Sequence, residues 1–166
     1  MREMGFTLIE LMITLVVAAI ILSVAAPSFV RVIDNNRITT ATNDFSASLA
    51  LAKTEAVKRN RNVKLIAKNG DWAQGYEIGV DRNSDDDFSD TDETTLKKVD
   101  AVEGTVTVDP SPNTLIVIEF NSLGGLNGLS GADSIVFDST RYACERTITL
   151  NASGVFTVSK EIEPCS

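Results

Sequence analysis

The sequence predicts an α+β fold in which one long N-terminal helix packs on an antiparallel β-sheet head. Twenty residues without a charge run from Leu11 to Val30, and an amphipathic pattern of helical period continues to about Arg59. Short runs of alternating hydrophobicity fill the remainder. With 166 residues, 43% of them hydrophobic, the chain can supply one membrane segment and one small domain with a single core.

The uncharged run is long enough to cross a membrane. At about 1.5 Å per helical residue it matches the roughly 30 Å hydrocarbon core of a bilayer, so we predict a spanning helix over residues 6–27. A secretory signal instead has a basic start, a shorter apolar region and a cleavage site after it. Here Arg2 is offset by Glu3 and the apolar run is too long for such a signal.

The helix is expected to continue beyond Pro27. This proline removes one backbone donor, so we expect a kink there without an end to the helix. Beyond it, apolar residues recur mostly every three or four positions, at Val30, Ile33, Ile38, Ala41, Phe45, Leu49, Ala52 and Ala56. This pattern predicts an amphipathic helix over residues 28–60, and the two halves together form one helix of about fifty residues.

Residues 61–166 are predicted to form a β-rich head, and residues 28–166 a soluble domain. The expected strands are 63–67, 76–80, 96–99, 105–108, 115–120, 134–137, 147–150 and 155–159. Asn69-Gly70 predicts a tight turn, and residues 151–154 a hairpin connection. The glycine-rich segment 124–131 is predicted to be a flexible connection before a strand. Trp72 and Tyr76 are expected in the core.

The first ten residues, M-R-E-M-G-F-T-L-I-E, resemble the class III signal of type IV prepilins and type II secretion pseudopilins. In that family a dedicated peptidase cuts after a glycine and methylates the new N-terminus. The resemblance implies that residues 1–5 are a leader and that the cut falls between Gly5 and Phe6. It also implies that Glu10 pairs with the N-terminal amine of a neighbouring subunit.

Glu10 is also a candidate on physical grounds. An ionised residue inside a spanning helix costs a few kcal/mol, which marks it as a functional position. The alternative is a glutamate in the headgroup region, where the dipole at the start of a helix favours an anion.

Three further segments resemble the GspH/FimT family of minor pilins and minor pseudopilins: N-N-R-I-T-T at 35–40, L-A-K-T-E-A-V-K-R-N-R-N-V at 51–63 and D-W-A-Q-G-Y-E-I-G-V-D-R-N at 71–83. The resemblance implies the type IV pilin fold and a non-enzymatic, low-copy subunit that primes or caps a type IV pilus. The alternative is a minor pseudopilin of a type II secretion system.

The same resemblance implies the partners and the location of the chain. The partners are a prepilin peptidase, other minor and major pilins or pseudopilins, and the inner membrane. The expected location is a single pass through the bacterial inner membrane with the head in the periplasm, and later the tip of a pilus or pseudopilus.

A DNA-binding tip pilin is a rival hypothesis, which the net charge of -8 disfavours. Six basic residues between Lys53 and Lys68 form a candidate patch, which also fits a helix end or contact with an acidic subunit. In DNA-receptor relatives an arginine-bearing stretch follows the glycine of the last hairpin. The matching stretch here, residues 154–157, has no arginine.

Cys144 and Cys165 are the two cysteines, and the chain has no histidine. A zinc site or a Cys-His nucleophile is therefore not expected, and we predict no enzyme; an anchored enzyme would rest on the anchor alone. In the oxidising compartment that the resemblance implies, a disulfide closing a loop of about 20 residues contributes roughly 3 kcal/mol. The alternative is two separate buried thiols.

Residues 81–93, D-R-N-S-D-D-D-F-S-D-T-D-E, carry seven carboxylates against one arginine. Asp81, Asn83, Asp85 and Asp87 alternate as the oxygen ligands of a calcium loop do, with Asp92 at the twelfth place. Against calcium, Asp86 stands where a turn glycine is wanted and the last ligand is not a glutamate. A solvated acidic loop is the alternative, and no other cofactor is expected.

Overall fold

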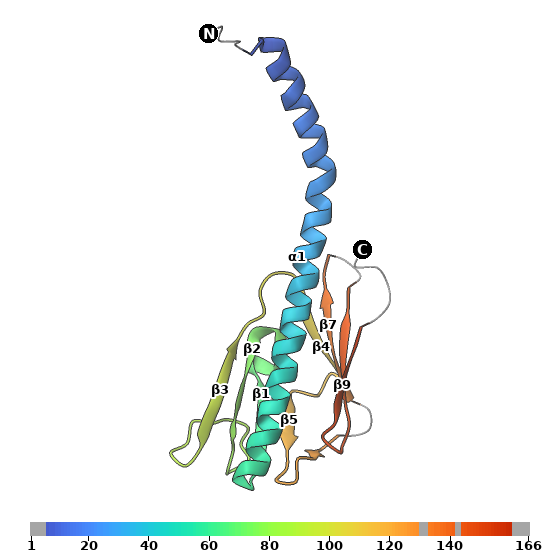
Figure 1. Cartoon of the computed structure of the whole chain (residues 1–166). Helices are drawn as coiled ribbons and strands as arrows, with labels where there is room; N and C mark the ends of the chain where they lie inside the picture. The colour runs from blue at the N-terminus through green and yellow to red at the C-terminus, as the bar shows by residue number, and fades with distance from the viewer. Residues whose placement is uncertain (1–5, 130–132, 142–143, 161–166) are drawn as a thin grey trace.

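The computed structural model describes residues 6–129, 133–141 and 144–160. One helix, α1 (Leu8–Arg59, 52 residues), runs through both predicted halves and passes Pro27 without interruption. Thr7 caps its start, and Asn60, in the left-handed conformation with φ 52°, caps its end. Figure 1 shows the first half of α1 projecting from the head as a curved stalk, while the second half lies across the strands.

The described residues of the head form two antiparallel sheets. The first has the strand order β3-β2-β1-β5-β6, and the second has the order β4-β7-β8-β9. In chain order the strands are β1 (Val63–Ala67), β2 (Gly75–Val80), β3 (Thr94–Asp100), β4 (Val106–Ser111), β5 (Val117–Phe120), β6 (Leu126–Asn127), β7 (Asp133–Ser139), β8 (Arg146–Leu150) and β9 (Phe156–Lys160). Two short 3-10 turns, η1 (Lys68–Gly70) and η2 (Trp72–Gln74), connect β1 to β2.

The predicted α+β architecture is confirmed, with two differences in detail. The eight expected strands are present, but they divide between two sheets, because alternation shows which residues face the core and not which strands pair. The segment predicted as a flexible connection instead turns at Asn121 to Gly125 and forms β6, where Phe120 pairs with Leu126.

Phe45 of α1 joins the two sheets in one core. Its ring makes edge-on contacts with Trp72, Tyr76 and Phe137, at centroid distances of 5.2, 5.1 and 5.6 Å. Tyr76 belongs to the first sheet and Phe137 to the second. Because Phe45 is 1% exposed, this cluster holds the helix and both sheets together, and the core prediction for Trp72 and Tyr76 is confirmed.

The polar atoms of the two aromatic core residues find partners. Trp72 Nε1 donates to the carbonyl oxygen of Leu115 at 2.7 Å, and the Tyr76 hydroxyl donates to Ser48 Oγ at 3.0 Å. Burial raises the pKa of Tyr76 to about 12, so its hydroxyl stays protonated and remains a donor at physiological pH. These bonds fix the rings beneath α1.

Candidate functional site

The stalk of α1 exposes an apolar surface on all sides. Within the described part of the chain, α1 is the one helix that is both long enough and apolar enough to cross a membrane. No residue in its most apolar stretch is buried. Phe6 is 85% exposed and Leu22 is 66% exposed, with large apolar side chains between them similarly open. So much exposed apolar surface is unstable in water and requires a lipid or protein environment.

Glu10 lies in the first turn of α1, where it closes a capping box with Thr7. Glu10 Oε2 accepts from the Thr7 N–H at 3.0 Å and from Thr7 Oγ1 at 2.8 Å, and the Glu10 N–H donates back to Thr7 Oγ1 at 3.3 Å. Both side-chain bonds end on Oε2. The position at a helix start matches the dipole interpretation of Glu10, while pairing with a neighbouring subunit stays a prediction. Gly5, the predicted cleavage residue, lies outside the described residues.

A lysine from the sheet lies inside the acidic loop that joins β2 to β3. Lys64 Nζ lies 2.7 Å from Asp81 Oδ2 and 2.7 Å from Asp86 Oδ1. The Lys64 side chain is 9% exposed and that of Asp81 is 0% exposed, whereas that of Asp86 is 53% exposed. The predicted acidic loop is therefore pinned to the sheet by a buried ion pair.

The pKa values of this pair follow from its contacts. Burial disfavours the charged form of Lys64 and so lowers its pKa. The hydrogen bonds to Asp81 and Asp86 and the attraction of their negative charges outweigh this effect, so the pKa of Lys64 lies above its usual value. Burial likewise acts against the Asp81 carboxylate, yet Lys64 and the backbone N–H groups of Ser84 and Asp86 hold its pKa below the usual value. Both groups are charged at neutral pH.

The predicted calcium ligands are only partly brought together. Asp81 and Asp85 each place an oxygen within 4.8 Å of the other and of an oxygen of Glu93. Asn83 Nδ2 donates to Asp85 at 2.7 Å, so Asn83 takes part as a donor. Asp87 lies outside this group and accepts from Ser89 instead. Because Asp81 and Asp85 are the two predicted ligands that lie together, calcium binding stays a prediction.

Glu93 was missed because it stands one place beyond the twelfth position of the motif. Its Oε1 accepts from the Arg82 N–H at 3.0 Å. Asp90, which accepts from Asn83 at 2.7 Å, completes the cluster of acids. Desolvation, followed by the charges of Glu93 and Asp85, raises the pKa of Asp90.

Four of the six basic residues in the candidate patch have partners of their own. Lys64 is paired inside the acidic loop, and Lys53 Nζ donates to the carbonyl oxygen of Gly154 at 2.9 Å. Lys58 and Arg59 pair with Glu55 in the last turns of α1. Of the other two, Arg61 follows the end of α1 and Lys68 begins η1 at the other end of β1, so the six residues do not gather in one surface for DNA.

The far end of the head, where α1 ends, is built from three chain segments. The turn after β5 packs beside Val57 and Lys53, and the hairpin between β8 and β9 packs against that turn. The predicted hairpin is confirmed by the Asn151 N–H, which donates to the Val155 carbonyl oxygen at 3.0 Å. Gly154, with φ 72°, contacts the Gly124 carbonyl so closely that a Cβ has no room.

Cys144 is 2% exposed. Its predicted disulfide partner, Cys165, lies outside the described residues. The bridge therefore stays a prediction.

Comparison with known proteins accounts for both parts of the chain. The family described as type II transport protein GspH matches residues 41–154, which is more than half of the chain and most of the head. The chain belongs to the GspH family. The prokaryotic N-terminal methylation motif matches residues 2–26, a range that contains Gly5, Phe6 and Glu10. No curated protein matches the chain.

The fold of this GspH family member is that of a solved minor pilin. The crystal structure of the type IV minor pilin FimU of Pseudomonas aeruginosa in space group P21 has a TM-score of 0.62 and 21% identity, covering 78% of this chain and 90% of that chain. The P65 form gives 0.61 and 21%, covering 76% and 93%. The family and the fold confirm the predicted resemblance and make the chain a pilin-like structural subunit of the minor pilin or pseudopilin kind.

Proposed function

We propose that this chain is a minor pilin that primes or caps a type IV pilus. The observation that carries the proposal is the continuous helix α1, whose first half is apolar and exposed on all sides and whose second half belongs to the core of the head. Such a helix can lie in a membrane before assembly and in the apolar centre of a filament afterwards. The methylation motif over the same residues supports this use of the helix.

Processing and assembly divide between two sets of residues. A prepilin peptidase cuts between Gly5 and Phe6, and the new amine on Phe6 becomes the cationic group of each subunit. The carboxylate of Glu10 supplies the anion. Thr7 donates to Oε2 of this carboxylate, so Oε1 is open to the amine of a neighbouring subunit. Pairing of the two charges makes their burial in an apolar filament tolerable and sets the register of the subunit.

The proposed cellular location of the chain follows from these roles of its N-terminus. The chain is held by α1 in the inner membrane with its head in the periplasm, and it then enters the filament tip beside other minor and major pilins. An oxidising periplasm favours the bridge between Cys144 and Cys165.

A minor pseudopilin of a type II secretion system is the second candidate, favoured by the description of the matched family. Deletion of the gene followed by two assays separates the candidates: counts of surface pili, and release of secreted enzymes into the medium. Loss of pili with normal secretion is the result we expect. The reverse result would assign the chain to secretion, and normal values in both assays would contradict a priming role.

The role of Glu10 has its own test. The Glu10→Gln chain should be processed normally and be absent from sheared filaments, because the amide keeps the size of the side chain and removes its charge. Thr7→Val, which removes the hydroxyl of the capping box, is the matched control and should still enter filaments. Incorporation of Glu10→Gln at the normal level would show that the carboxylate charge is not needed.

A further inference from the structure

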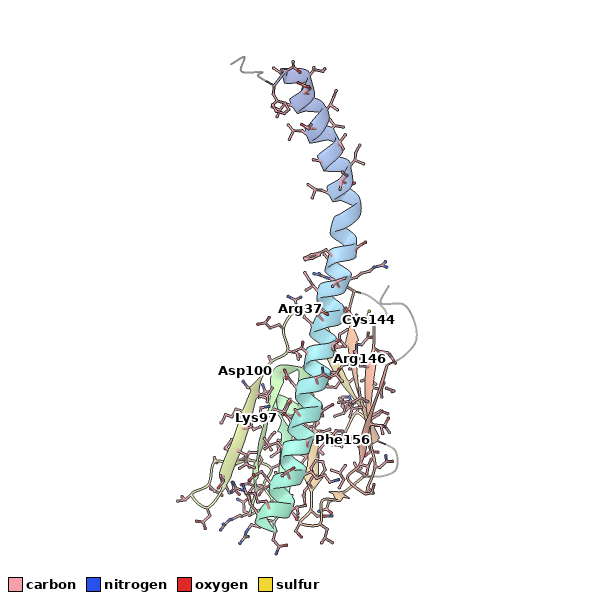
Figure 2. All side chains as sticks on the ribbon, in the orientation of Figure 1. Arg37, Lys97, Asp100, Cys144, Arg146 and Phe156 are labelled. Atoms are coloured by element: carbon pink, nitrogen blue, oxygen red, sulfur yellow. The ribbon has the colours of Figure 1, made fainter. Side chains whose placement is uncertain are left out.

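A groove of about 450 Å³ opens between α1 and the segment that joins β3 to β4. Arg37 and Asp44 line it from the helix, Asp100 lines it from the end of β3, and residues 101–103 line it from the segment. Figure 2 shows Arg37 and Asp100 on the same side of the head, toward the end from which α1 leaves it. The groove therefore opens near the stalk, far from the acidic loop and the last hairpin.

The floor of this groove is aromatic. Phe45, Trp72, Tyr76 and Phe137, the ring cluster of the core, all contribute to its lining. Each of these four rings is 5% exposed or less, so together with the valines around them they offer a ligand an apolar floor. Aliphatic parts of a ligand gain from the same floor by burial.

The rim of the groove is acidic. The side chains of Asp44, Asp100 and Glu103 are exposed, and within the described residues none of the three has a hydrogen bond or an ion pair. Among the described residues that line the groove, Arg37 is the one basic residue, and it forms an ion pair with a buried aspartate. Its Nη1 lies 3.5 Å from Asp34, a residue with 0% exposure, and a Cβ at Gly104 would lie 2.6 Å from the same nitrogen.

An apolar floor beneath three carboxylates has the chemistry of a receptor for a side chain that is cationic at its tip and apolar along its stem. We propose that this groove takes a lysine or arginine, flanked by apolar residues, from the adjacent pilin subunit of the filament. The inference rests on the proposed role in filament assembly and adds the partner surface to it.

The opposite end of this head shows that a pilin can present such chemistry. The side chain of Lys58, in the last turn of α1, stays 71% exposed beside its partner Glu55, and the exposed apolar residues Val57 and Leu123 lie at the same end. Subunits that stack with their helices in one direction place the α1 end of one head against the groove end of the next, a head-to-tail contact. Charge and apolar character then match across the contact.

A photo-crosslinking residue at Ala101, which is exposed at the edge of the groove, tests the proposal in cells that assemble filaments. We expect a crosslink to another pilin through a peptide that contains lysine or arginine. In the chain with Asp100→Lys and Glu103→Lys the yield should fall about tenfold or more, because like charges then meet across the interface. Asp109→Lys, an exposed site on β4 outside the groove, is the matched control and should leave the yield unchanged.

The outcomes separate the groove from the proposed function. Two results with the chain present in sheared filaments would overturn the groove and leave the proposed function standing. One is the absence of a crosslink from Ala101 to a pilin, and the other is a crosslink whose yield the double charge reversal does not change. If the chain is absent from filaments, both fail. A yield that falls equally with Asp109→Lys would show a general charge effect and would also overturn the specific groove.

Discussion

Removal of the lysine inside the acidic loop should be the most costly single change of charge in the head. Lys64→Met leaves Asp81, whose side chain has 0% exposure, without its cation, and breaking a buried pair in this way costs about 3–5 kcal/mol. The pair with the 53% exposed Asp86 adds less than about 1 kcal/mol. A loss of this size lowers the melting temperature by about 10 °C.

The assay is thermal unfolding of the full chain in detergent, followed by the fluorescence of its single tryptophan, Trp72, which is 2% exposed. Lys98→Met is the matched control. Lys98 also lies 2.8 Å from a carboxylate, that of Glu77, but the two side chains are 67% and 39% exposed, so its loss should cost under about 1 kcal/mol. Asp81→Asn added to Lys64→Met should recover about half of the loss, because the unpaired charge is gone.

The pH dependence fixes the sign of the effect. The native pKa of Asp81 is lowered, so its contribution is present above the unfolded value near 4 and is lost as the pH falls through the native value. Lys64 has a raised pKa, so its contribution is lost only as the pH rises above 10.5. Without Lys64 the buried Asp81 carboxyl takes up a proton more readily, so the gap between the variant and the natural chain should narrow toward pH 3. A Lys64→Met chain within about 1 kcal/mol of the natural chain, with a gap independent of pH, would refute the buried pair.

The remaining predictions concern backbone fit, the core and calcium. Gly154→Ala should lower the free energy of unfolding by about 3 kcal/mol, because the new Cβ collides with the Gly124 carbonyl oxygen. The control Gly70→Ala, at φ 75° but with open space around the new Cβ, should cost about 1 kcal/mol. Equal losses would contradict the close contact at Gly154. Phe45→Ala should cost about 3–5 kcal/mol and broaden the transition, since its ring joins both sheets; a loss under 1 kcal/mol would show that the sheets hold without it. Millimolar calcium should shift the melting temperature by less than about 2 °C, because the acidic loop over residues 81–93 already pairs with a lysine; a larger, saturable shift would establish a calcium site there.

The periodic parts of the chain could be predicted closely from the sequence. The predicted helix end near Arg59 and the strand Val63–Ala67 coincide with α1 and β1, because the switch from a period of 3.6 to a period of 2 is sharp at Asn60. Leu126 and Asn127 escaped prediction, since a two-residue strand is too short for any period and glycines surround it.

Contacts between distant residues could not be predicted in the same way. Lys64 was counted in a basic patch because it is near Arg59 and Arg61 in sequence, yet pairing of β1 with β2 places it against Asp81. The groove at Asp100 likewise depends on where the segment after β3 crosses α1, which no local pattern records. Glu93 was missed because the calcium motif was read by spacing alone.

The proposed function requires that the N-terminus of the chain is processed as that of a pilin. The most direct measurement is the intact mass and N-terminal sequence of the full chain, expressed with and without a prepilin peptidase. We expect loss of residues 1–5 and a methylated Phe6 only when the peptidase is present, and an uncut product from a Gly5→Leu chain. An unprocessed natural chain in the presence of an active peptidase would contradict the claim.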